Sequence, residues 1–135
     1  MKKIGIILSS VFIICIFSFL YFETTDFSGN WHFEGVQTDF SLSLTQQSTA
    51  ITGRHCSILY SGTKIDCSVD DSDPATITGT ASEADSVNLI FKTTVSDNPG
   101  QATIKRISAT QIKWTITKEP EGEFFIPSNA ILTKE

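Results

Sequence analysis

The sequence lacks the motifs that mark the common classes of enzyme. It contains no Gly-x-Ser-x-Gly, no His-Glu-x-x-His and no glycine-rich loop of the kind that holds a phosphate. Its two histidines, His32 and His55, adjoin no nucleophile motif, and a general base needs a partner within hydrogen-bond reach. We therefore predict that the protein is not an enzyme and uses no cofactor.

Metal-ligand spacing is also missing. His55 and Cys56 are neighbours on a predicted strand, so their side chains point to opposite faces and do not converge on one ion. Asp70, Asp71 and Asp73 lie close together, but the glycine and the distal glutamate of a dedicated calcium loop are absent. No metal site is predicted. The three aspartates are interpreted as a solvated turn, with a loop that contacts a basic partner as the alternative.

Basic charge is scarce in the main part of the chain. Between Asp26 and Glu135, eight Lys and Arg residues stand against fourteen Asp and Glu residues, which gives a net charge of −6. An acidic surface repels phosphate backbones, and no stripe of basic residues occurs. Nucleic-acid binding is therefore not expected.

One long apolar run is present. Residues 4–22 carry no charge, follow Lys2 and Lys3, and precede Glu23. At about 1.5 Å per residue the run makes roughly 28 Å of helix, close to the hydrocarbon thickness of about 30 Å. The two lysines predict a cytoplasmic N-terminus with the remaining chain beyond the membrane. We expect residues 1–25 to be a hydrophobic signal-anchor helix and residues 26–135 to be one extracytoplasmic domain.

The end of the run favours a retained anchor over a cleaved signal. No Ala-x-Ala site occurs there, and Leu20, Tyr21 and Phe22 are bulky residues to leave beside a cleavage point. Cys15 follows the bulky residues 12–14, unlike a lipidation signal. We predict a membrane-anchored domain in the periplasm or extracellular space, with a secreted or periplasmic form after signal cleavage as the alternative.

Cysteine is rare beyond this run, where only Cys56 and Cys67 occur. An isolated pair in an oxidising compartment most often forms a disulfide. Free thiols or a metal-bound pair are the alternatives. The closed loop of about a dozen residues would stabilise the domain by about 3 kcal/mol in the chain-entropy model.

A helical pattern is absent after Phe22, and apolar residues instead alternate with polar ones. This alternation is clear in residues 40–44, 87–95 and 112–116, and it indicates strands with one buried and one solvated face. Gly53 and Gly79 occupy matching positions in two such segments, as expected where a sheet bends to close. We predict an all-β, up-and-down antiparallel barrel of about eight strands: 30–36, 39–46, 49–56, 63–69, 75–81, 86–95, 101–107 and 110–118, with a closing segment at 123–133.

The alternation also predicts which residues face inward. The expected inner face comprises Trp31, Phe33, Phe40, Leu42, Leu44, Ile51, Ile77, Val87, Leu89, Phe91, Ile104, Ile112, Trp114 and Ile116. An eight-stranded barrel has room for packed side chains or for one small ligand. The bulk of the five aromatic residues favours a packed core. A pocket for a small lipophilic molecule, lined by Trp31, Phe33, Phe40, Leu42, Phe91 and Trp114, is the alternative.

Two segments resemble a known family. Gly29-Asn30-Trp31 opens the first strand, and residues 112–116 place Trp114 in a late strand. This pattern resembles the calycin barrels (lipocalins, avidins and their bacterial relatives), in which the first tryptophan packs across the closed end. The Thr-Asp-Tyr signature, a C-terminal helix and an arginine after Trp114 are absent. Arg54 or Arg106 could cover the first tryptophan instead.

Surface recognition is the function class that remains. We expect a non-enzymatic binding module of the bacterial cell envelope that contacts another envelope or extracellular protein, as an inhibitor, an immunity factor or an accessory protein. Loops on a rigid barrel often carry such contacts. The alternative is a carrier that holds a lipophilic small molecule inside the barrel.

Overall fold

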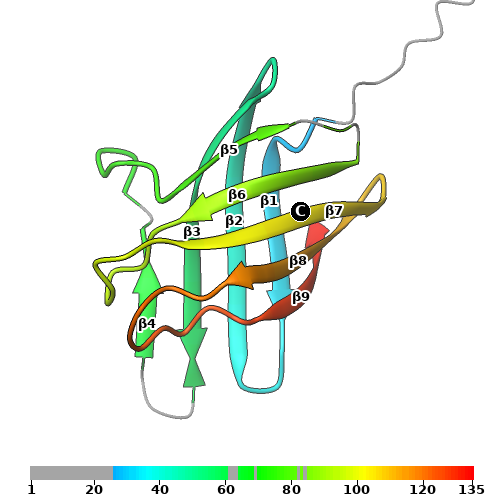
Figure 1. The fold of residues 1–135 in the computed structure, drawn as a ribbon. Coiled ribbons are helices and arrows are strands. Elements are labelled where there is room, and N and C mark those ends of the chain that lie inside the picture. Colours follow the sequence, from blue (N-terminus) through cyan, green and yellow to red (C-terminus); the bar gives the residue numbers. More distant parts are fainter. Residues whose placement is uncertain (1–25, 61–63, 69, 82, 84) are drawn as a thin grey trace, which may run out of the picture.

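The protein is described here by a computed structural model, which covers residues 26–60, 64–68, 70–81, 83 and 85–135. Within these ranges no helix is long and apolar enough to cross a membrane. The hydrophobic helix predicted for residues 4–22 lies outside the described residues. The described residues form nine β-strands, which are labelled in Figure 1: β1 (Gly29–Glu34), β2 (Thr38–Gln47), β3 (Ala50–Leu59), β4 (Lys64–Cys67), β5 (Ile77–Ala81), β6 (Ser86–Phe91), β7 (Gly100–Ser108), β8 (Gln111–Lys118) and β9 (Asn129–Lys134).

Eight of these strands close into a barrel. Going round it, the order is β1, β2, β3, β5, β6, β7, β8 and β9, and every neighbouring pair is antiparallel. The barrel closes where β9 pairs with β1, with Trp31 opposite Lys134 and His32 opposite Thr133. The predicted all-β antiparallel barrel of eight strands is therefore confirmed.

The membership of the barrel differs from the prediction at one strand. β3 runs to Leu59, beyond the predicted end at residue 56, and it pairs with two strands along the same edge. Its first half, residues 50–53, pairs with β5, and its second half, residues 56–59, pairs with β4. The segment predicted as the fourth barrel strand is thus a short flanking strand beside the far half of β3 (Figure 1). The eighth place is taken by β9, which begins only after Pro127.

The core is formed by the residues that the alternation of apolar and polar side chains predicts to face inward. Apart from Phe33 and Ile116, which are partly buried against the core, every residue of the expected inner face is buried. The Trp114 ring is fully buried, with the Phe40 ring edge-on at 5.2 Å and the Phe91 ring at 5.4 Å between centroids. Burying each such side chain contributes about 2 to 3 kcal/mol. Phe27 and Ile126, outside the strands, join the same core and were not predicted.

Trp31 lies at the end of the barrel where residue 26 enters. Its side chain is fully buried, and its indole N–H donates a hydrogen bond to the carbonyl of Phe27 at 2.9 Å. The Arg106 guanidinium lies over the rings of Phe27 and Trp31, at 4.7 and 6.0 Å from their centroids. Such cation–π contacts stabilise by about 0.5 to 2 kcal/mol. Of the two arginines considered from the sequence, Arg106 covers the tryptophan, and Arg54 does not.

The predicted disulfide is confirmed. Cys56 on β3 and Cys67 on β4 are cross-strand partners, and their sulfur atoms are bonded. β4 has only four residues and pairs with no strand but β3 among those described. The disulfide is therefore a main covalent constraint that keeps β4 against the barrel.

Replacing both cysteines, Cys56→Ser with Cys67→Ser, should lower the free energy of unfolding by about 3 kcal/mol, because the unfolded chain loses its cross-link. Urea unfolding followed by the fluorescence of Trp31 and Trp114 measures this loss. Reduction of the unaltered protein should give the same loss, and Cys15→Ser should give none. Equal stability of the oxidised protein and the double variant would contradict the structural role of this bond.

Candidate functional site

The outer surface of β5 to β8 is the leading candidate for a binding surface. We call it the polar wall, defined by the outward side chains Thr78, Thr80, Ser86, Asn88, Ile90, Gln101, Thr103, Thr115 and Thr117. These positions face outward because their strand neighbours, such as Leu89 and Ala102, point into the core. All but Ile90 carry hydroxyl or amide groups, so the wall is an array of uncharged hydrogen-bond donors and acceptors.

The wall has a regular register. Thr80 lies opposite Asn88, Asn88 opposite Thr103, and Thr103 opposite Thr115, so these four residues form one rung across four strands. The Thr103 hydroxyl donates to the side-chain carbonyl of Asn88 at 3.1 Å. The rung thus holds its polar groups in fixed relative positions on a closed, rigid sheet.

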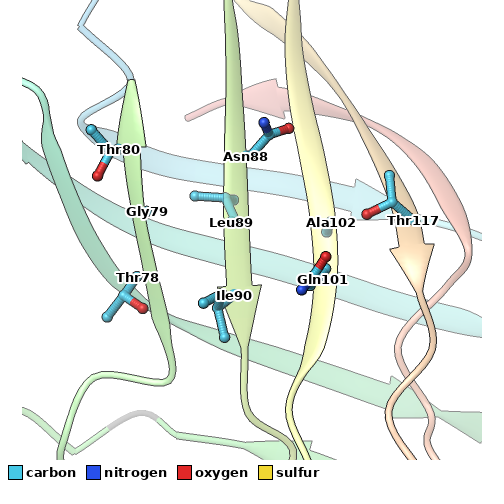
Figure 2. A pocket seen from close by; sticks show the side chains of 9 residues that line it. All are labelled: Thr78, Gly79, Thr80, Asn88, Leu89, Ile90, Gln101, Ala102 and Thr117. Atoms are coloured by element: carbon cyan, nitrogen blue, oxygen red, sulfur yellow. The ribbon is translucent and has the colours of Figure 1, made fainter. Parts of the chain in front are cut away.

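A shallow hollow of about 810 Å³ lies on this wall (Figure 2). Side chains from β5, β6, β7 and β8 border it, including Thr78, Asn88, Gln101 and Thr117. Gly79 of β5 lies at its floor, where a Cβ would stand 2.5 Å from the carbonyl oxygen of Asn88. Only glycine allows β5 to approach β6 this closely, so any larger residue at position 79 would displace the strand.

The wall carries no carboxylate. Within the described strands the acidic residues are Glu34 on β1, Asp39 on β2 and Asp66 on β4, and β5 to β9 have none. The remaining acidic residues of the domain lie in turns, loops and the terminal segments. This surface was not predicted, because outward polar residues in a strand have the sequence pattern of any solvated strand face. The available signal was the absence of any acid between residues 98 and 118.

A second polar group lies inside the barrel, near β4. The Nε2 atom of His55 lies 3.0 Å from Oδ1 of Asp66, and both side chains are fully buried. This contact is electrostatic, since Nε2 does not meet hydrogen-bond geometry. The Oδ1 atom also accepts the backbone N–H of Thr94 at 3.1 Å. We call His55 and Asp66 the buried clasp, because it joins β3, β4 and the loop after β6.

Thr76 completes this arrangement from the segment before β5. Its hydroxyl oxygen accepts the backbone N–H of His55 at 3.2 Å and lies 2.8 Å from Nδ1 of the same residue. The Thr76 hydroxyl therefore lies within hydrogen-bond reach of both the backbone N–H and the ring Nδ1 of His55. The order hydroxyl, imidazole, carboxylate is that of a proton relay, but the full burial of the imidazole keeps it from a substrate. We interpret the clasp as structural.

The clasp changes the acidity of its carboxyl group. Burial raises the pKa of Asp66, while the contacts with His55 and with the Thr94 N–H together lower it by more. The net pKa of Asp66 therefore lies below its ordinary value of 3.8, and the charged form is favoured in the folded state. His55 is a polar residue on the inward face of β3, which also carries the buried Ser57, and these polar residues at inward positions were the signal for this cluster in the sequence.

The residues predicted to line a pocket inside the barrel belong to the packed core. Trp31, Phe40, Leu42, Phe91 and Trp114 are fully buried in the core, and Phe33 is partly buried at its edge. Among the described residues, no group of three or more His, Cys, Asp and Glu side chains is placed to hold a metal ion. The interior thus presents packed rings and the buried contact of His55 with Asp66 at its described positions.

The aspartate loop is exposed and partly held by Arg54. The Arg54 guanidinium donates to the backbone carbonyls of Asp71 and Asp73, at 3.1 and 2.5 Å, and lies 3.8 Å from the Asp71 carboxylate. The Asp70 carboxylate accepts hydrogen bonds from Ser72, which lowers the pKa of Asp70. Arg54 and Ser72 of the same chain therefore already contact part of the acidic groups of this loop. The role of Asp70, Asp71 and Asp73 as a partner-contact loop stays a prediction.

Asp66→Asn should lower the free energy of unfolding by about 2 kcal/mol at pH 7, because the buried imidazole of His55 and the N–H of Thr94 lose their charged partner. The pKa of Asp66 is lowered by folding, so its contribution is present above pH 4 and is lost as the pH falls through the lower folded value. The difference between the two proteins should therefore shrink as the pH falls below about 4, as measured by urea unfolding. Asp97→Asn, in an exposed loop, is the control and should change little. A pH-independent difference would contradict the clasp.

Comparison with known proteins gives no family for this chain. No family model, no curated protein and no solved structure matches it.

Proposed function

We propose that this protein is a membrane-anchored, non-enzymatic binding module of the cell envelope, and that it contacts another envelope or extracellular protein through the polar wall. The apolar run of residues 4–22 supports the location, because it has the length and flanking charges of a signal anchor. The disulfide between Cys56 and Cys67 supports an oxidising compartment.

The observation that carries the proposal is the hollowed, carboxylate-free wall on an otherwise acidic domain. Protein interfaces need polar groups that are held in place and are not strongly hydrated, and Thr, Asn and Gln side chains on a closed sheet supply them. The hollow offers concave shape, which increases the contact area with a protruding partner. Both features lie on rigid strands, where little conformational entropy is lost on binding.

The packing of the interior supports a contact on the outside over a ligand on the inside. Phe40 and Phe91 both pack against Trp114 inside the barrel, where a lipophilic ligand would have to lie. The fold is also compatible with a calycin-like barrel, since eight antiparallel strands close and Arg106 covers the first tryptophan. We propose that the protein shares the barrel architecture of the calycins. A shared architecture does not imply that it carries a ligand as they do.

Site-specific photo-cross-linking in intact cells tests this proposal. A photoreactive residue at Thr103, at the centre of the wall, should give one dominant covalent product with another protein. The matched control is Ser43, which is exposed on β2, four strands from β7 in either direction round the barrel. Products of equal yield at Ser43, or none at Thr103, would contradict the proposal. A lipophilic molecule that co-purifies with the protein would favour the carrier instead.

A further inference from the structure

We infer that the surface of the partner protein that meets the polar wall is acidic, and that its carboxylates are bound by four lysines at the borders of the wall. This inference rests on the proposed function and names the chemistry of the partner. The four residues, which we call the lysine frame, are Lys92, Lys105, Lys113 and Lys118.

The frame lies on two sides of the uncharged floor. Lys105 on β7 is directly opposite Lys113 on β8, next to the rung of Thr103 and Thr115. Lys118 is opposite Gln101, four residues along β7 from Lys105. At about 3.3 Å per residue, this places the two sides of the frame roughly 13 Å apart. Lys92 follows the end of β6 on the same side as Lys118, and all four side chains belong to exposed residues.

The other cationic residues of the domain are already engaged. Arg54 holds the aspartate loop, Lys64 pairs with Glu123 at 2.6 Å, and Arg106 lies over Phe27 and Trp31. Lys134 lies 5.5 Å from the centroid of the Trp31 ring. The eight Lys and Arg residues after residue 25 therefore divide into four with contacts inside the domain and four that border the wall. None of the ion pairs in the described part of the chain involves the frame.

Lys105 and Lys113 repel each other across adjacent strands, and an acidic partner would reduce this repulsion. Like charges directly opposite one another on adjacent strands destabilise the pair. No carboxylate on β6 to β9 relieves this repulsion within the described strands. A carboxylate of the partner placed between the two ammonium groups would offset the repulsion between them, and would speed association through attraction at longer range.

A protein fits this frame better than other polyanions. The net charge of −6 on residues 26–135 repels a nucleic acid, whose charge extends far beyond the wall. Binding to an anionic bilayer uses clustered basic residues, whereas here an uncharged floor of hydroxyl and amide groups separates the two sides. A folded partner can place a few carboxylates at this spacing and pair its own polar groups with the floor.

The test uses the full-length protein in detergent micelles and poly-L-glutamate as the probe, with binding measured by titration at 50 and 200 mM salt. Lys105→Gln with Lys113→Gln should weaken binding about ten-fold at low salt, because two charged contacts are lost. The control is Arg54→Gln with Lys64→Gln, which makes the same change in net charge away from the wall and should weaken binding less than about two-fold. Circular dichroism verifies that each variant keeps its sheet.

Three outcomes would overturn the inference. The unaltered protein could fail to bind poly-L-glutamate, or both pairs of substitutions could weaken binding equally. The third outcome is that the protein binds anionic lipid vesicles through Lys105 and Lys113 but does not bind the peptide. Cross-linking at Thr103 separates this result from the proposed function. A cross-link that persists unchanged in the Lys105→Gln, Lys113→Gln variant would support the proposed binding module and would contradict an acidic partner surface. The absence of any cross-link in the unaltered protein would contradict the proposed function itself.

Discussion

Closure of the sheet around the rings of Phe40, Phe91 and Trp114 is the constraint on which the rest of the structure depends. A strand pair exposes one polar edge on each side, and closure removes these edges from all eight barrel strands. Closure also fixes the two faces of every strand, because a one-residue slip would turn the apolar side chains outward. The polar wall exists because its strands are held in register by the core behind them.

The long strand β3 shows how the barrel accommodates an irregular element. One edge of β3 serves two partners, β5 along its first half and β4 along its second. The change of partner occurs at His55 and Cys56, where the buried clasp and the disulfide both cross to β4. A short strand with one neighbour gains little from its own hydrogen bonds, so the contact of His55 with Asp66 and a covalent bond replace the missing second neighbour. These two links set the position of the loops around that end of the barrel.

Much of the architecture could be predicted because period-two alternation reports directly on burial. Phe40, Leu42 and Trp114 were placed inward for that reason, and the structure buries them. The role of β4 could not be predicted in the same way, because alternation identifies a strand without specifying which part of a neighbour it pairs with. The clasp was missed because a buried His55 and a distant Asp66 become partners only through register. The wall was missed because a binding surface of threonine and asparagine has the composition of any solvated strand face.

The distribution of charge links the fold to the proposed contact. Acidic residues are confined largely to turns and loops, while the cations without internal contacts lie along one side of the barrel. Chemical labelling of lysines in intact cells, compared with labelling of the purified protein, tests this account most directly. It predicts that Lys105, Lys113 and Lys118 react several-fold less in cells, while Lys64 reacts equally in both. Equal reactivity of all four lysines in the two preparations would contradict a partner on the polar wall.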